Sequence, residues 1–203
     1  MYFPTSGVVS LLTPTGDGIG IAVGMVGWDG MLPVCVALGS GVSGQKAVVQ
    51  IAGTALTINA VKLQQQMKEH LALERALLSY VQTQFNAVAQ TAACNRLHLL
   101  EHRVACWLLM AHDRIAGNEI HITHEALARL LGTRRPGITV AAQALQDQDL
   151  IAYRHGAVLV RNRRGLEAVA CECYGAITSV AVTATRQDHD AIAPGLRSPS
   201  VPQ

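Results

Sequence analysis

Apolar residues recur at helical spacing over two short segments between residues 122 and 151. In the first segment the apolar set, which shares one face of a helix, is Leu127, Leu130 and Leu131. Thr123 precedes this set and can cap the helix, because its hydroxyl accepts a hydrogen bond from an otherwise unpaired backbone N–H. Glu125 lies in the first turn, where the helix dipole favours a negative charge. The sequence therefore predicts a short helix that ends at Gly132, the residue type preferred at the C′ position.

A second helix is predicted directly afterwards, with Thr133 as its N-cap and Pro136 in its first turn, where the missing N–H breaks no intrahelical bond. Its expected buried stripe consists of Ile138, Ala141, Ala142 and Leu145. Its opposite face consists of Pro136, Thr139, Val140 and Gln143, and its N-terminal end carries Arg134 and Arg135. This arrangement is typical of the recognition helix in a helix-turn-helix. An antiparallel helix pair with one solvated face has the same pattern, so both interpretations stay open at this point.

Two short strands are predicted behind the second helix. Residues 150–154 alternate between apolar and polar side chains, His155-Gly156 forms a tight turn, and residues 157–160 return as the second strand. Such a wing converts a helix-turn-helix into a winged helix. Residues 120–165 contain seven arginines and three acidic residues, whereas residues 1–70 contain three lysines and three acidic residues. The net charge of +2 therefore originates in the part predicted to face phosphates.

At this point the chain resembles the Crp/Fnr family of bacterial transcription regulators. The resemblance covers most of the chain and is strongest from Asn95 to Tyr174, over NRLHLLEHRVACWLLMAHDRI, ITHEALARLLGTRRPGITVAAQALQDQDLI, the wing and GLEAVACECY. It is closest to members whose recognition helix contains RRPG. The resemblance implies an α+β fold with an antiparallel, jelly-roll-like β-roll, a long dimerisation helix and a C-terminal winged helix-turn-helix. It divides the chain into a partial cyclic-nucleotide-binding-like roll (1–58), a helical segment (59–94), a DNA-binding domain (95–175) and a disordered tail (176–203).

The side-chain chemistry of the second helix and the wing indicates which residues would contact DNA, and how. Arg135 is expected to contact a base, most simply guanine O6 and N7, while Arg134 and the hydroxyls of Thr123 and Thr139 position the helix on phosphates. The best-known branch of the family has Glu and a further Arg where this chain has Pro136 and Val140, so a different operator is expected. The full expected DNA-binding set is Thr123, Arg134, Arg135, Pro136, Thr139, Val140, Gln143, Arg154 and His155, with Arg161 as a further contact of the wing with the DNA backbone.

The N-terminal part of the chain is rich in glycine, and residues 1–58 hold eleven of the eighteen glycines. Short apolar or alternating runs separated by glycine-rich turns predict closely spaced antiparallel strands. These runs are residues 8–12, 19–26, 46–51 and 55–58. GDGIG resembles a phosphate loop, but it precedes a predicted strand rather than a helix, which argues against that function. Family members carry several strands before the segment that matches residues 2–7, so the roll is expected to be shortened.

The resemblance also locates the effector site of the family between Gly27 and Ala47. There a Glu binds the ribose and an Arg binds the phosphate of a cyclic nucleotide. This chain has Asp29 and Lys46 near those positions, and Lys cannot reproduce the bidentate fork of Arg. Asp29 and Lys46 are therefore weak candidates for an effector site of unknown specificity, and cyclic nucleotide binding is not expected.

Residues 59–94 contain neither proline nor glycine and predict helix, with a short piece at 60–68 and a main helix from about Leu71. Apolar residues repeat along the main helix at three-, four- and seven-residue spacings: Leu71, Leu77, Leu78, Val81, Phe85 and Val88. Packing against the chain's own core and pairing with a second copy both fit this stripe, and the resemblance favours pairing. A hinge is expected at residues 93–97, followed by a helix over residues 97–115.

Several histidines and cysteines are candidate metal ligands. His98 and His102 are four residues apart, but no cysteine or carboxylate in the sequence completes a convincing set with them or with His112. Cys171 and Cys173 are expected to lie in one helix, where residues two apart point to different faces, so they make a poor chelate and a poor disulfide. The sequence therefore predicts no metal site. A sensor of the iron–sulfur type is not supported either, since only Cys35 lies near the N-terminus.

Composition narrows the remaining function classes. Half of the 203 residues are apolar, no apolar run reaches the length of a membrane span, and five cysteines without a paired framework favour a reducing cytoplasm. The roll contains no histidine and no Ser–His–Asp set, so neither an enzyme nor a cofactor is expected. The predicted partners are double-stranded DNA and a second copy of the chain, with RNA polymerase as a further candidate. The alternative is a protein-interaction module with a degenerate sensor and no specific DNA binding.

Overall fold

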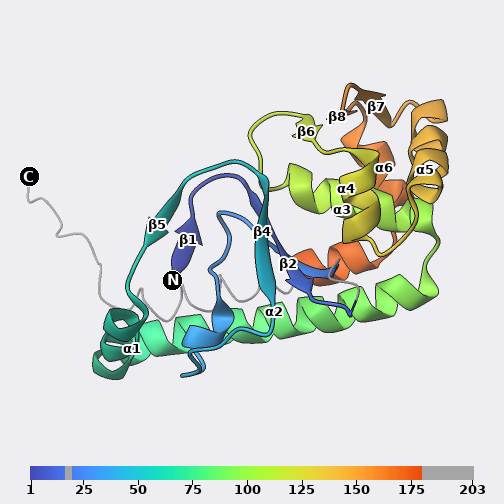
Figure 1. The fold of residues 1–203 in the computed structure, drawn as a ribbon. Helices are drawn as coiled ribbons and strands as arrows, with labels where there is room; N and C mark the ends of the chain where they lie inside the picture. The colour runs from blue at the N-terminus through green and yellow to red at the C-terminus, as the bar shows by residue number, and fades with distance from the viewer. Residues whose placement is uncertain (17–19, 180–203) are drawn as a thin grey trace, which may run out of the picture.

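A computed structural model describes residues 1–16 and 20–179. The chain forms β-strands at its N-terminus, a long helix along one side of the molecule, and a compact domain of helices with a small sheet at its C-terminal end (Figure 1). This mixed α+β architecture with antiparallel sheets confirms the predicted fold class.

The N-terminal roll contains two antiparallel sheets. β1 (Tyr2–Pro4) pairs with β5 (Ala55–Thr57), which brings the two ends of the roll together. β2 (Val8–Thr13) is the central strand of the second sheet, between β3 (Ile21–Val26) and β4 (Lys46–Ile51). A short 3-10 helix, η1 (Val34–Val36), lies in the connection from β3 to β4. The four strands predicted from apolar runs are therefore present.

Two helices follow the roll. α1 (Ala60–Glu69) is capped by Asn59, whose side-chain oxygen accepts a hydrogen bond from the Val61 N–H at 2.9 Å. α2 (Leu71–Leu97) is 27 residues long, which corresponds to about 40 Å at 1.5 Å per residue. It lies along both the roll and the C-terminal domain (Figure 1). The expected hinge at residues 93–97 is wrong in position, because α2 stays helical to Leu97 and the backbone becomes extended at His98 and Leu99.

The C-terminal domain contains four helices that pack together, α3 to α6, and a three-stranded antiparallel sheet. The chain order is α3 (Leu100–His112), β6 (Glu119–His121), α4 (His124–Leu130), α5 (Arg135–Asp147), β7 (Ile151–Arg154), β8 (Ala157–Val160) and α6 (Arg163–Val169). The strand order is β6-β8-β7, so the predicted two-stranded wing carries a third strand. Residues 173–179 are again helical, which contradicts a disordered tail from residue 176; the rest of that predicted tail lies outside the described residues.

The roll and the C-terminal domain share one hydrophobic core. Val8, Leu12 and Met25 of the roll pack in the same cluster as the buried side chains of α3, α4 and α5. An ion pair joins the two parts as well, between Asp29 after β3 and Arg114 after α3, at 2.5 Å. The contact between the roll and the C-terminal domain is therefore mainly apolar packing, of the same kind as the packing inside each of them.

Candidate nucleic-acid interface

α4 and α5 form the helix pair that the sequence predicts. The Thr123 hydroxyl accepts a hydrogen bond from the Ala126 N–H at 3.1 Å and caps α4, as expected. At the other end Gly132 has a φ of +61°, in the left-handed region. The Gly132 N–H donates to the Arg129 carbonyl at 3.2 Å, and the Thr133 N–H donates to the Ala128 carbonyl at 2.9 Å. These two bonds make a Schellman motif, which ends α4 and turns the chain into α5.

The first turn of α5 differs from the prediction in one respect. The expected N-cap, Thr133, is wrong: its N–H completes the Schellman motif of α4, and the next residue, Arg134, takes the extended N-cap conformation without a side-chain cap. Pro136 lies in the first turn, as predicted. Arg134 and Arg135 are exposed, and neither guanidinium forms an ion pair with another described residue. Two positive charges therefore remain available at this helix end.

The rest of α5 has one buried and one exposed face. The predicted stripe of Ile138, Ala141, Ala142 and Leu145 is buried. Pro136, Thr139, Val140 and Gln143 are all exposed, and Val140 is 71% exposed although it is apolar. An exposed branched apolar side chain between polar neighbours suits contact with an apolar group such as a thymine methyl.

His124, which the sequence analysis did not single out, connects this face to the wing. Its Nδ1 lies 3.1 Å from the Thr139 hydroxyl, and its ring stacks on Tyr153 of β7 at a centroid distance of 4.1 Å. Burial and the positive charge of Arg135 lower the pKa of His124. The Tyr153 hydroxyl accepts from the His124 N–H and donates to the Ile122 carbonyl, both at 3.1 Å. No sequence pattern marks this contact, because it joins three separate elements.

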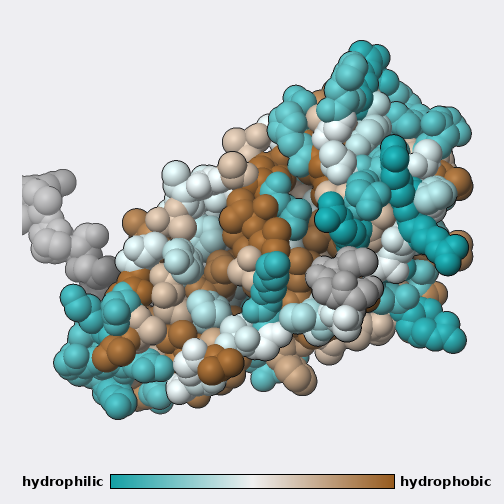
Figure 2. All heavy atoms as spheres, viewed as in Figure 1, coloured by the Kyte–Doolittle hydropathy of each residue, from teal (hydrophilic) through white to brown (hydrophobic). Residues whose placement is uncertain are grey.

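The wing turns at His155-Gly156, where both residues have positive φ, 49° and 81°. Successive left-handed residues give the tight turn type that suits a two-residue hairpin. Arg154 and His155 are exposed at this tip. Arg161, expected as a further contact, forms an ion pair with Asp149 at 2.5 Å. Figure 2 shows hydrophilic residues gathered over the end of the molecule where Figure 1 places α5 and the wing.

The two weak effector candidates do not come together in the roll. The Asp29 carboxylate accepts hydrogen bonds from Arg114 on both oxygens, at 3.1 and 2.5 Å, and from the Gly27 N–H at 3.1 Å. Lys46 is exposed at the start of β4. The roll does hold a cavity of about 240 Å³, but the described residues that line it are apolar or uncharged, and neither candidate is among them.

Comparison with known families identifies the C-terminal part of the chain. A family model described as the Crp-like helix-turn-helix domain matches residues 102–169, from α3 to α6. The chain carries a Crp-like helix-turn-helix domain. Within this Crp-like domain, α4 and α5 are the helix-turn-helix and β6, β7 and β8 form the wing. A comparison with curated proteins finds no match.

Solved structures resemble a much longer part of the chain than the Crp-like domain alone. A protein described as a transcriptional regulator of the Crp/Fnr family from Eubacterium rectale has a TM-score of 0.64 and 22% identity, over 83% of this chain and 79% of that one. FixK2 from Bradyrhizobium japonicum has a TM-score of 0.61 and 16% identity, over 84% and 86%. The c-di-GMP-responsive regulator CLP from Xanthomonas campestris has a TM-score of 0.58 and 18% identity, over 78% and 83%.

These similarities extend over the roll, α2 and the Crp-like domain. The chain thus has the fold of Crp/Fnr transcription regulators, with a helix-turn-helix DNA-binding domain. No helix within residues 1–16 and 20–179 combines the length and the apolar character needed to cross a bilayer.

Proposed function

We propose that the chain is a sequence-specific transcription regulator that binds a palindromic operator in double-stranded DNA as a homodimer, through the recognition helix at 134–146. The observation that carries this proposal is the exposed face of α5, which lies in a Crp-like domain and has at its N-terminal end two arginines that form no ion pair with any described residue. Guanidinium forks at the end of a helix that enters the major groove are the usual readers of guanine.

The proposed contacts fall into two classes. Arg135 contacts a base, and Val140 packs on a thymine methyl. The remaining contacts position the protein and carry little sequence information; they are made by Arg134, Thr123, Pro136, Thr139, Gln143, Arg154 and His155. Because Thr139 already bonds the neighbouring His124, its hydroxyl is held in place before DNA arrives.

A dimer along α2 is part of this proposal. Three large apolar residues, Leu71, Leu78 and Phe85, are exposed on α2 at intervals of seven residues. Seven-residue spacing of exposed apolar residues along one side of a helix is the pattern of a coiled-coil seam. Two copies joined there carry two recognition helices, which suits half-sites about 34 Å apart.

The other parts follow from the same proposal. The roll (1–58), the dimerisation segment (59–94) and the reader (95–175) work as one cytoplasmic regulator without enzymatic activity, and RNA polymerase is a candidate partner on the DNA. We further propose that the roll does not bind a cyclic nucleotide. The support is that Asp29 is engaged by Arg114 and that the cavity of the roll is lined by uncharged described residues.

Selection from a random DNA duplex pool at two salt concentrations tests the function. The expected result is a palindromic consensus, and Arg135→Ala is expected to lose about 1–3 kcal/mol of binding and to relax one position of each half-site. Lys62→Ala, which removes one positive charge from α1, is the matched control and keeps the consensus. Weak binding without a consensus, equal in all three proteins, would instead favour a protein-interaction module.

A further inference from the structure

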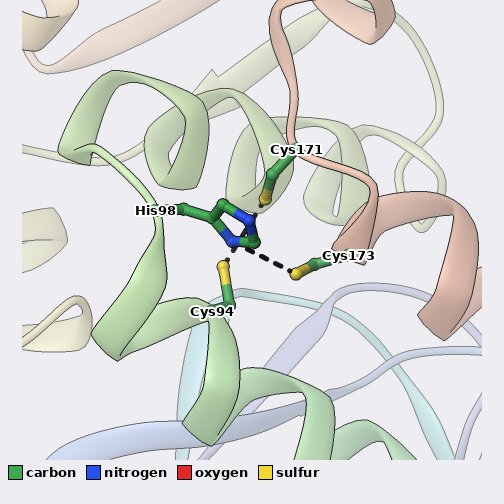
Figure 3. A group of neighbouring side chains, drawn as sticks. All are labelled: Cys94, His98, Cys171 and Cys173. Carbon is green, nitrogen blue, oxygen red and sulfur yellow. Dashed lines mark hydrogen bonds between the residues drawn. The ribbon is translucent and has the colours of Figure 1, made fainter.

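Four potential metal ligands converge where α2 ends. They are Cys94, His98, Cys171 and Cys173, and their ligand atoms all lie within 4.8 Å of one another (Figure 3). The three cysteines are buried, His98 is half-buried, and none of the cysteines is in a disulfide. Cys94 and His98 come from the end of α2, and the other two come from the segment that follows α6.

A break in the helix brings the last two cysteines to the same side. α6 ends at Val169, Ala170 is extended with ψ of 147°, and helix resumes only at residue 173. The expectation that Cys171 and Cys173 occupy one helix and point apart is therefore wrong, because Cys171 lies in the break. The expectation that no cysteine completes a set with His98 is wrong as well: Cys94 lies four residues before it, and Cys171 and Cys173 reach it from more than seventy residues away in sequence.

The spacing of these atoms is close to that of a tetrahedral zinc site. The Sγ atoms of Cys94 and Cys171 are 3.5 Å apart, and Cys173 Sγ is 3.5 Å from His98 Nδ1. With zinc–sulfur bonds of about 2.3 Å and zinc–nitrogen bonds of about 2.0–2.1 Å, neighbouring ligands of a tetrahedral site are about 3.8 Å apart for two sulfurs and about 3.5 Å apart for sulfur and nitrogen. These two pairs therefore need shifts of only a few tenths of an ångström.

The surrounding contacts orient the ligands. His98 Nε2 lies 3.1 Å from a carboxylate oxygen of Glu172, an arrangement in which Nε2 carries the proton and Nδ1 keeps its lone pair for a metal. Histidines that bind zinc commonly donate their other ring N–H to a carboxylate in this way, which fixes the tautomer and the orientation of the ring. The Gln90 amide donates to Cys173 Sγ at 3.0 Å, a bond that favours thiolate.

We propose that Cys94, His98, Cys171 and Cys173 bind one zinc ion per chain in a closed, four-ligand structural site. Three thiolates and one imidazole in a tetrahedral arrangement are a donor set that selects zinc over hard cations such as magnesium. The ion joins the end of α2 to the segment behind α6 and so fixes the Crp-like domain on the long helix. This inference does not depend on DNA binding.

Metal content of the full chain tests the proposal. Protein purified without chelator is expected to hold about one zinc per chain, and cobalt-substituted protein is expected to show thiolate-to-cobalt charge-transfer bands and the d–d bands of tetrahedral cobalt. Cys94→Ser, His98→Gln, Cys171→Ser and Cys173→Ser are each expected to lower zinc occupancy about tenfold or more after dialysis against a competing chelator. Cys35→Ser is the matched control, because Cys35 lies in η1 of the roll and is not one of the four ligands; this variant is expected to retain the metal.

Three results would overturn the proposal. The first is wild-type protein without zinc that gives no tetrahedral cobalt spectrum. The second is zinc retained by the ligand variants as well as by Cys35→Ser. The third is three reactive thiols, in place of the expected five, after denaturation of the metal-free chain, because a disulfide would then occupy the cluster. A second test needs no variant. A chelator is added to the cobalt-substituted wild type, and loss of the tetrahedral cobalt bands reports removal of the metal from the site.

Discussion

At the scale of single residues, the contact between His124, Thr139 and Tyr153 decides how the helix pair and the wing are held together. The three side chains come from α4, α5 and β7, and each meets the next by a hydrogen bond or a ring contact. Because Arg135 lies beside this contact and lowers the pKa of His124, protonation of the imidazole disturbs the proposed reading face.

We predict that His124 makes the folded state less stable at low pH. Burial and the charge of Arg135 depress the folded pKa of His124 below its ordinary value of 6.5, so the unfolded chain binds more protons in the interval between the two pKa values. The free energy of unfolding therefore falls as the pH is lowered through 6.5. Urea unfolding at pH 7.5 and 5.5 measures this fall, which is expected to be smaller in His124→Gln. His121→Gln, exposed on β6, is the control; an unchanged fall in His124→Gln would refute the prediction.

At the scale of elements, the exposed stripe of α2 is predicted to be the dimer seam. Leu78→Glu places a charge in that seam and removes a side chain whose burial contributes about 1.5–3 kcal/mol. Both protomers of a two-fold dimer carry the substitution, so its cost in binding free energy applies twice. The dimer Kd is therefore expected to rise at least about 100-fold. Sedimentation velocity across a concentration series measures it.

Val61→Glu provides the matched control for the dimer. Val61 is also an exposed apolar residue, but it lies on α1 outside the stripe. The control is expected to dimerise like the wild type. A wild type that stays monomeric at high concentration, or a Leu78→Glu variant that still dimerises, would show that the stripe is not the seam.

How far the sequence predicts these elements depends on the range of the interactions involved. The strands of the roll, the two helices before the Crp-like domain and the buried stripe of α5 follow from apolar periodicity, which is a local property. β6 has only three residues, too few for a visible alternation, and it is held by pairing with β8 almost forty residues later. The cap at Thr133 was wrong by one residue because the Schellman motif of α4 takes up its N–H.

The candidate sites differ in the same way. The exposed arginines of α5 are neighbours in sequence, so their common position could be predicted. The metal ligands were missed because Cys94 and Cys171 meet only after the whole Crp-like domain has folded between them. The signal that could have found them is a pair of closely spaced cysteines next to a predicted helix end, together with a Cys and a His four residues apart.

At the scale of the whole molecule, Asp29 and Arg114 connect the roll to the Crp-like domain. The guanidinium is 9% exposed and the carboxylate 26%. Asp29→Asn leaves a nearly buried positive charge without its partner, and we expect it to lower the free energy of unfolding by about 1.5–3 kcal/mol. Asp149→Asn breaks the exposed Arg161 pair instead and is expected to change it by less than about 1 kcal/mol. Urea unfolding at pH 7 measures the free energy of unfolding of both variants. Equal losses would mean that the Asp29–Arg114 pair contributes no more to stability than the exposed Asp149–Arg161 pair.

The place where the chain enters the Crp-like domain is also the place where it leaves. Cys94, before the domain, and Cys171, after it, have thiols 3.5 Å apart. A segment whose two ends coincide can be excised, or inserted into another protein, without stretching its host, and its own ends can be rejoined by a short linker. The Crp-like domain of this chain is therefore joined to the rest of the chain covalently at one place, where both of its ends lie, while its packing on the roll is non-covalent.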